Sequence, residues 1–181
     1  MRHRLPLEVA AVQVFEAIKS RRSVRRYRRE DVPDELVLKV LEAARWAPSS
    51  KNRQPWSFVV VRNPVVKKEL AKLAAFGGFL AEAPVVIAVV TDPRASPRFH
   101  EVDGSCAVEN MMLAAWSLGL GTCWIGTMDR EGAKQLLGVP EELNLLTVIP
   151  LGYPAEESRA PSRKSLDELV YWERFGQRKS D

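Results

Sequence analysis

The sequence lacks long hydrophobic runs and has few residues that could cross-link the chain. Its longest apolar stretch, Ala83 to Val90, has eight residues, whereas a membrane-spanning helix needs about 20. The two cysteines, Cys106 and Cys123, form no C-x-x-C motif, and the two histidines, His3 and His100, are not spaced to join them around zinc. We therefore expect no membrane span, no metal site, and free thiols as in a reducing compartment.

Composition and length narrow the class of protein further. With 46% hydrophobic residues and a net charge of +4, the chain is too apolar and too weakly charged to be disordered. Its 181 residues fit a single domain, at roughly 150 residues per domain. Glu8 and Gln13 interrupt the apolar N-terminal stretch and no A-x-A site follows, so we expect no signal peptide and a cytoplasmic protein.

The positive charge of the chain is concentrated in one short segment. Lys19 to Arg29 holds seven cations and no acid, and without these seven charges the remaining chain would carry −3. A nucleic-acid-binding domain usually spreads its excess charge over a face. One short cluster therefore favours a single anionic group as the ligand, with a basic nucleic-acid-binding module as a remote alternative.

Hydrophobic periodicity and the Pro and Gly residues predict a mixture of helices and strands. We expect helices over about 8–20, from Pro33 at its first position to just before Pro48, from Asn63-Pro64 through Phe76, over about 103–118 and over about 129–137. We expect strands over 57–62, 85–91, 122–125 and 145–151. Because helices and strands do not alternate strictly, the pattern favours an α+β fold over a doubly wound sheet.

Two further segments bear on assembly. The helix over 103–118, which Gly119 or Gly121 should end, is apolar on nearly all sides, which predicts deep burial at a dimer interface. The residues from 153 to the end contain several proline breaks and are expected to form an extended C-terminal arm of the single domain.

Several common catalytic motifs are absent. Gly119 and Gly121 begin a dinucleotide fingerprint, but position 124 is Trp instead of the required Gly. There is no Walker A loop, no zincin helix and no G-x-S-x-G elbow. A Ser-His or Cys-His nucleophile would depend on His100 alone, which we expect to be a solvent-facing loop residue.

Three polar or glycine-rich segments remain, and each can be interpreted either as a ligand-binding segment or as ordinary structure. Arg21 to Tyr27 (RRSVRRY) suits one phosphate, since arginines bind phosphate bidentately, or is a solvated basic turn. Pro48 to Phe58 (PSSKNRQPWSF) presents amides and hydroxyls that match the edge of a heterocycle, or is an ordinary polar loop. Gly119 to Gly126 (GLGTCWIG) lets the backbone approach a flat ligand, or is a helix end running into a core strand.

In this order, the three segments resemble the nitroreductase family of FMN-dependent oxidoreductases. Members of that family carry an R-R-S-x-R-x-[YF] segment, a P-S-x-x-N-x-Q-P-W-x-F loop and a G-L-G-T-x-x-[IL]-G turn after a long central helix. Arg163-Lys164 in the proline-rich arm and the ending Leu169 to Arg174 (LVYWER) fit as well. The resemblance covers roughly residues 12 to 175.

The resemblance implies a mixed central sheet flanked by helices, in an intertwined homodimer with two FMN sites at its interface, and a C-terminal arm that would reach the partner subunit. It implies that the arginine segment and the arm hold the phosphate and ribityl chain, that the polar loop reaches the flavin of the other subunit, and that the glycine turn lies along the ring, with a backbone N–H at flavin N5. The cofactor-binding residues would be Arg21, Arg22, Ser23, Arg25, Pro48, Ser49, Ser50, Asn52, Gln54, Cys123, Trp124, Ile125, Gly126, Arg163 and Lys164.

The resemblance also implies the reaction. Tightly bound FMN would take hydride from NADH or NADPH and reduce a small acceptor, such as a nitroaromatic or a quinone, in a ping-pong cycle that needs no side-chain acid or base. The alternative is a specialised flavin enzyme, dehalogenase-like or dehydrogenase-like, that NAD(P)H does not reduce. The segment before the central helix is short, which implies an open substrate pocket with Phe99, His100 and Glu101 at its rim. Trp124 is either a core residue or part of the pocket wall.

Overall fold

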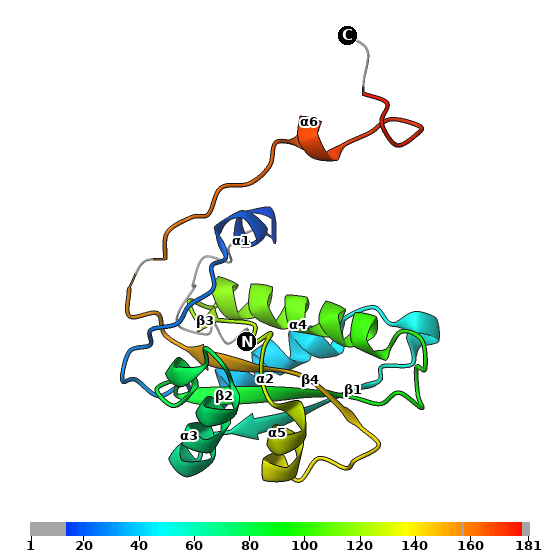
Figure 1. The fold of residues 1–181 in the computed structure, drawn as a ribbon. Helices are drawn as coiled ribbons and strands as arrows, with labels where there is room; N and C mark the ends of the chain where they lie inside the picture. Colours follow the sequence, from blue (N-terminus) through cyan, green and yellow to red (C-terminus); the bar gives the residue numbers. More distant parts are fainter. Residues whose placement is uncertain (1–13, 157, 179–181) are drawn as a thin grey trace, which may run out of the picture.

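A four-stranded antiparallel sheet forms the centre of the molecule in the computed structural model, which describes residues 14–156 and 158–178 (Figure 1). The strands β1 (Trp56–Val61), β2 (Val85–Thr91), β3 (Gly121–Thr122) and β4 (Asn144–Gly152) lie in the order β1-β2-β4-β3. The helices are α1 (Val14–Ser20), α2 (Asp34–Arg45), α3 (Pro64–Leu73), α4 (His100–Ser117), α5 (Arg130–Leu137) and α6 (Leu166–Leu169), with short 3-10 turns at Ser50–Asn52 and Gly78–Leu80.

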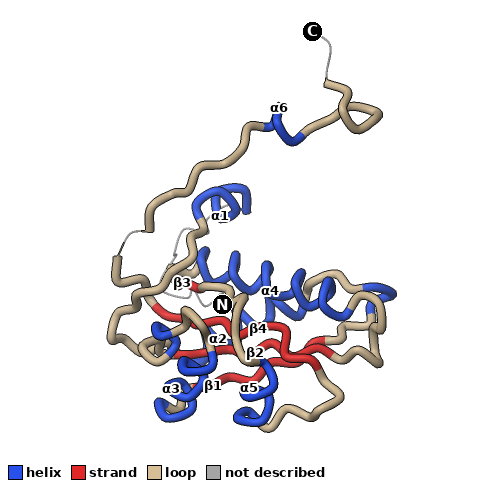
Figure 2. The backbone as a smooth tube through the Cα atoms, in the orientation of Figure 1, coloured by secondary structure: helices blue, strands red, loops and turns tan. Residues whose placement is uncertain are grey.

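Helices cover both faces of this sheet (Figures 1 and 2). Alternate residues of β2 pack on each side: Val85, Ile87 and Val89 join the cluster under α2 and α4, whereas Val86 and Ala88 join the cluster under α3 and α5. All seven residues of β2 are buried, which explains why its sequence is a continuous apolar run and does not alternate. The α+β prediction is thereby confirmed.

The arginine segment, Arg21 to Tyr27, has an extended backbone. It lies beside β3, where Val24 N donates to Thr122 O at 2.8 Å and Ser23 forms a parallel bridge with Thr122. Tyr27 forms an antiparallel bridge with Pro154, so the segment also contacts the residues that follow β4. These backbone contacts fix the arginines at the edge of the sheet.

Several element boundaries differ from the predicted ones. The third helix ends at Leu73, because Ala74 bridges Met128 and Ala75 N donates to Thr127 O instead of continuing the helix. Pro33 is the N-cap of α2 instead of its first helical residue, and makes no side-chain capping bond. Asp129 is the N-cap of α5, and its side chain accepts from Gly132 N. The predicted start of the first helix, residues 8–13, lies outside the described residues.

Two more differences concern the surroundings of α4. This helix begins at His100 and not at 103, and it ends just before Gly119, whose φ of 77° is a left-handed conformation that favours glycine. The strand predicted over 122–125 consists of Gly121 and Thr122 alone, so the four residues that follow are outside the sheet. One face of α4 is buried in this chain, whereas Val102 and Glu109 are exposed, because a single chain covers only the side that packs on α2 and the sheet.

The C-terminal residues 158–178 run away from the sheet and its helices (Figure 1). They contain α6, whose start is fixed by a capping box between Ser165 and Glu168. Leu166, Leu169 and Phe175 are exposed on this segment. Among the helices of the described residues, none has the length and hydropathy needed to cross a bilayer.

Candidate functional site

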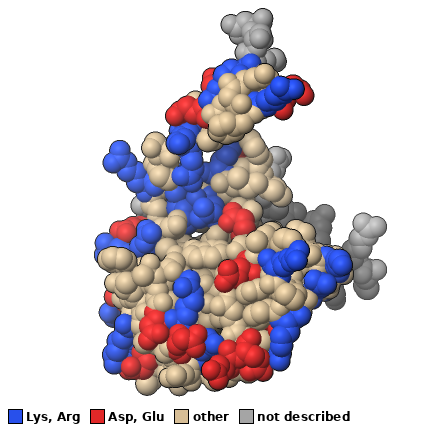
Figure 3. Space-filling model, turned by 45° about the vertical axis from the view of Figure 1, so that its right-hand side comes forward, with Lys and Arg blue, Asp and Glu red and all other residues tan. Residues whose placement is uncertain are grey.

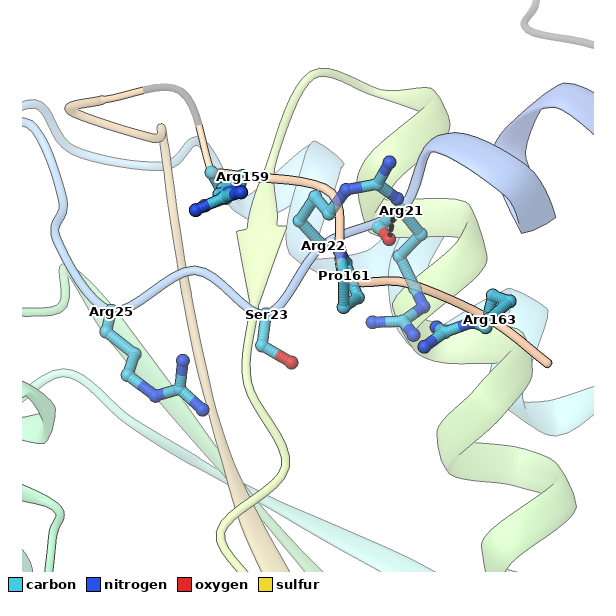
Figure 4. Close-up of a pocket in the computed structure, with 8 residues that line it drawn as sticks. Arg21, Arg22, Ser23, Arg25, Arg159, Pro161 and Arg163 are labelled. Atoms are coloured by element: carbon cyan, nitrogen blue, oxygen red, sulfur yellow. Dashed lines mark hydrogen bonds between the residues drawn. The ribbon is translucent and has the colours of Figure 1, made fainter.

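An arginine-lined cavity of about 290 Å³ lies between the segment after α1 and the C-terminal segment (Figure 4). Two parts of the chain that are far apart in sequence lie side by side here, and Lys and Arg side chains gather between the body of the molecule and the C-terminal segment (Figure 3). We refer to this space as the arginine cavity. Its lining residues are Arg21, Arg22, Ser23, Arg25, Ser158, Arg159, Pro161 and Arg163.

The arginine cavity has a large excess of positive charge. Five of its eight lining residues are arginines, and none of the eight is acidic. Arg22 is oriented by hydrogen bonds from Nη1 to Lys19 O and Arg21 O, both 2.8 Å. Within the described part of the chain, the one carboxylate paired with this cluster is that of Glu109, 3.9 Å from Arg21 Nε. Such a cavity suits a compact, strongly anionic group.

A second cavity of about 190 Å³ adjoins the first, because Arg25 lines both. We refer to it as the turn cavity, since Cys123 to Thr127, the turn after β3, forms one wall; Phe76 and Phe79 also line it. Gly126 is exposed there, and a Cβ added to it would meet no atom within 4 Å. The backbone of this turn is therefore open to a ligand.

Cys123 lines the turn cavity as a neutral thiol. Burial raises the pKa of its thiol, and this effect outweighs the opposing influence of Arg25 and of a hydrogen bond with Ser23. Because the thiolate is the nucleophilic form of cysteine, Cys123 is unsuited to nucleophilic catalysis. The site thus offers cations and backbone groups for binding, and its one thiol remains protonated.

The polar loop predicted to contact a ligand lines a third cavity, of about 260 Å³, which we refer to as the loop cavity. Its lining residues are Pro48, Ser49, Ser50, Phe99, Asp103 and Cys106. The arginine and turn cavities share none of these residues. The loop cavity lies at the N-terminal end of α4, whereas the arginine segment lies beside β3, which follows the C-terminal end of that helix (Figure 1).

The polar loop has a strained backbone that hydrogen bonds hold in place. Lys51, Asn52 and Gln54 all have positive φ, at 53°, 54° and 48°. Ser50 N donates to Asp103 Oδ1 at 3.0 Å, and Gln54 N donates to Ser49 Oγ at 2.9 Å. The same Asp103 carboxylate accepts from Ser96 Oγ at 2.8 Å, and it is buried. Asp103 therefore ties the loop to α4 and to the segment before α4.

The structure brings the predicted site residues into two groups. Arg21, Arg22, Ser23, Arg25 and Arg163 meet at the arginine cavity, which adjoins the turn cavity with Cys123, Trp124, Ile125 and Gly126; Pro48, Ser49 and Ser50 line the loop cavity, in the same loop as Asn52 and Gln54. Lys164 is exposed and lines none of these cavities.

The residues considered for a substrate rim separate in a similar way. Phe99 lines the loop cavity and Trp124 lines the turn cavity, where Trp124 also packs against the core. His100 is the first residue of α4 and not a loop residue, and its Nδ1 lies 2.9 Å from Thr91 Oγ1. Glu101 accepts from Asn144 Nδ2 at 3.2 Å. His100 and Glu101 line none of the three cavities.

Sequence reasoning missed several lining residues. Arg159 could have been predicted from the sequence, because it lies in the same proline-rich segment as Arg163. Nothing in the sequence marks Phe76 or Phe79 as a site residue, because Phe76 falls at the end of a predicted helix and Phe79 lies just beyond it. They line the turn cavity because α3 stops early and the chain after it pairs with Thr127 and Met128.

Comparison with known proteins agrees with this geometry. A relative from Methanothermobacter thermautotrophicus, named as an NADH dehydrogenase/NAD(P)H nitroreductase, is 43% identical over 155 residues, covering 82% of this chain and 81% of its own. A solved structure from Desulfovibrio desulfuricans, named as a nitroreductase in complex with FMN, has a TM-score of 0.80 and 38% identity, covering 90% of this chain and 98% of its own. Human iodotyrosine deiodinase 1 is 27% identical over 195 residues, covering 87% of this chain and 68% of its own.

The family assignment rests on a match along most of the sequence. The model of the Nitroreductase family matches residues 18–77 and 73–153, a span that contains the arginine segment, the polar loop and the turn after β3. The chain therefore belongs to the nitroreductase family.

Proposed function

We propose that this protein is a homodimeric, FMN-dependent oxidoreductase that takes hydride from NADH or NADPH and passes it to a small acceptor of the nitroaromatic or quinone type. The observation that carries the proposal is the joining of two cavities at Arg25, one lined by five arginines and the other by an open backbone turn. A phosphate at one end and a flat ring at the other match that arrangement. The relative solved in complex with FMN supports the same cofactor.

The arginine cavity fits the phosphate of FMN. Arg21, Arg25 and Arg163 would bind the phosphate oxygens through their guanidinium groups, and the Ser23 hydroxyl would add a neutral donor. Arg159 adds a cation beyond those predicted from the sequence, whereas Lys164 would act only from the margin. So many charge-assisted bonds support tight binding.

The turn cavity fits the isoalloxazine ring. The turn residues Cys123 to Gly126 would lie along the ring and exclude water from one of its edges. When bound, FMN would supply the hydride transfer itself, so this chain's residues need only bind and orient it. The neutral thiol of Cys123 agrees with a site in which no side chain serves as nucleophile, acid or base.

The loop cavity would belong to the second site of a dimer. Hydrogen bonds hold the loop of Ser50, Asn52 and Gln54 near the start of α4, and its cavity shares no lining residue with the arginine and turn cavities of the same chain. A two-fold dimer would bring the loop of one subunit to the arginine and turn cavities of the other. Exposed apolar side chains on α1, Phe15 and Ile18, support such an interface.

The acceptor would enter between aromatic side chains. Phe76, Phe79 and Trp124 line the turn cavity, and Phe99 lines the loop cavity that the other subunit would contribute. The short segment before α4 adds no helices of its own over the site, so we expect an open pocket that admits flat, apolar acceptors. The free thiols of Cys106 and Cys123 fit a protein of the reducing cytoplasm.

The test is an absorption spectrum of the purified protein, recorded without oxygen before and after addition of NADH or NADPH. We expect flavin bands that bleach when the nucleotide is added. Bands that persist with both nucleotides would contradict NAD(P)H as donor and favour a specialised enzyme of the same fold, as the similarity to iodotyrosine deiodinase 1 would permit. A protein without flavin bands, even after incubation with FMN, would overturn the proposal.

A further inference from the structure

The turn after β3 is held from behind by a buried hydroxyl. Thr147 is fully buried in β4, and its Oγ1 donates to Ile125 O at 2.9 Å; its contact with Val148 O is longer, at 3.3 Å. Because a hydroxyl has a single proton, the shorter bond defines its main acceptor. The carbonyl of Ile125 is thus fixed toward the interior of the molecule.

The opposite side of that peptide faces the turn cavity. In a planar trans peptide the C=O of one residue and the N–H of the next point in opposite directions, so a fixed Ile125 C=O also fixes the Gly126 N–H. Gly126 is exposed and lines the turn cavity. Within the part of the chain that the structure describes, the Gly126 N–H donates no hydrogen bond. It is therefore available to a ligand.

A β-bulge places Thr147 for this role. Thr147 pairs with Val89 and Leu145 pairs with Val90, so Leu146 is an extra residue in β4. Arg130 Nη2, at the start of α5, donates to Gly126 O at 3.2 Å and approaches the bulged Leu146 O at 3.5 Å. Two successive carbonyls of the turn are thus held from β4 and α5, and bulges recur beside functional sites for this kind of purpose.

We propose that Thr147 is a positioning residue that aims the Gly126 N–H at the ring of the bound cofactor. The inference rests on the proposed function, because it takes the turn cavity as the ring site. Thr147 itself lines neither the arginine cavity nor the turn cavity, and acts through the peptide that it orients. Removing its hydroxyl frees the peptide to rotate and weakens the hydrogen bond from Gly126.

The test compares Thr147→Val with Thr147→Ser, using apoprotein titrated with FMN. Loss of one hydrogen bond predicts that Thr147→Val raises the FMN dissociation constant about threefold to tenfold. It also shifts the absorption bands of the bound FMN, and Thr147→Ser restores both properties. Ser117→Ala is the control, since it removes another hydroxyl that donates to a backbone carbonyl, Ala114 O at 2.8 Å, away from the turn.

The possible outcomes separate this inference from the proposed function. If wild-type protein binds no FMN, the proposed function fails. If wild-type protein binds FMN, and Thr147→Val folds and binds it with unchanged affinity and spectrum, only the inference is overturned. Should Thr147→Val fail to fold, hydrogen exchange of the Gly126 amide in wild-type protein decides: exchange that slows when FMN binds supports the inference, and unchanged exchange overturns it.

Discussion

At the scale of single residues, the arginines differ in what they contact. Arg21 and Arg25 line the arginine cavity, whereas their neighbours Arg26 and Arg29 do not. Replacing Arg21 and Arg25 by Ala should weaken FMN binding by a few kcal/mol, since each hydrogen bond to a charged group contributes about 1.5–3 kcal/mol. Titration of apoprotein measures the change. The double variant Arg26→Ala/Arg29→Ala removes the same charge and should bind FMN normally; equal losses in both variants would contradict the phosphate assignment.

The arginines of the N-terminal segment were predictable because one short run of sequence carries them all. By contrast, the Asp103 carboxylate accepts a hydrogen bond from the N–H of Ser50, 53 residues away in sequence. Nothing in the sequence pattern around Asp103 predicts this contact. The positive φ of Asn52 and Gln54 was equally hidden, since neither residue is glycine. The sequence identified which side chains the loop presents, whereas the bonds that hold it depend on tertiary contacts.

At the scale of elements, the glycines of the turn have different functions. A Cβ on Gly121 would lie 2.5 Å from Val24 Cγ2, so this glycine lets β3 approach the arginine segment closely. A Cβ on Gly126 would meet nothing. Within this one segment, Gly121 therefore packs closely against its neighbour, whereas Gly126 has open space beside it. The shared motif alone could not make that distinction, because it depends on which neighbour lies opposite each glycine.

This difference predicts opposite effects of two substitutions to alanine. Gly121→Ala should destabilise the fold by about 1–3 kcal/mol through overpacking, because the buried Val24 cannot move without the strand-like segment that carries it. Gly126→Ala should leave the melting temperature close to that of the wild type. Thermal unfolding of the two variant apoproteins, compared with the wild type, measures these changes in stability. Adding Val24→Ala should recover part of the loss in Gly121→Ala, and a Gly126→Ala variant that is just as unstable would refute the distinction.

The last turn of α2 carries a pH-dependent contact. Hydrogen bonds from the Arg45 guanidinium and, to a smaller extent, from the Trp46 indole N–H lower the pKa of the Glu42 carboxyl to about 2. A carboxyl whose folded pKa is depressed contributes stability above its unfolded pKa, and this contribution is lost as the pH falls toward the folded pKa. The melting-temperature difference between wild type and Glu42→Gln should therefore be present at pH 7 and disappear as the pH falls from the ordinary glutamate range to about 2.

Glu141 provides the control for this measurement. It is exposed, and its carboxylate takes part in no hydrogen bond or ion pair within the described residues. Glu141→Gln should therefore differ little from wild type at any pH between 7 and about 2. A difference for Glu42→Gln that is the same at both ends of this range would contradict the proposed role of the Glu42 charge.

At the scale of the whole molecule, one chain leaves apolar side chains exposed on two of its helices. The apolar pattern of α4 predicted burial on nearly all sides, but the single chain buries one face and leaves Val102 and Glu109 exposed. On α1, the apolar side chains of Phe15 and Ile18 are likewise exposed. Hydrophobic periodicity therefore marks apolar surface, but it carries no information on which part of which chain would cover it.

Mixed dimers test the division of the site between subunits. One variant, Arg21→Ala/Arg25→Ala, lacks the arginine half; the other, Ser50→Ala/Asn52→Gly/Gln54→Gly, lacks the loop half. Glycine is chosen at positions 52 and 54 because both have positive φ. Each homodimer would have two defective sites. In a heterodimer whose sites combine both subunits, the intact arginines of one chain meet the intact loop of the other, so one site is restored while the second carries both defects.

We therefore expect heterodimers, purified through two different tags, to regain FMN binding that both parent homodimers have lost. The stoichiometry should be one FMN for each heterodimer, which titration against the flavin absorption measures directly. If each site instead lay within a single chain, every site of the heterodimer would carry one defect and no FMN would be regained. One variant lacks only the arginines and the other lacks only the loop side chains. FMN binding can therefore return only if the loop of one subunit completes the arginine and turn cavities of the other.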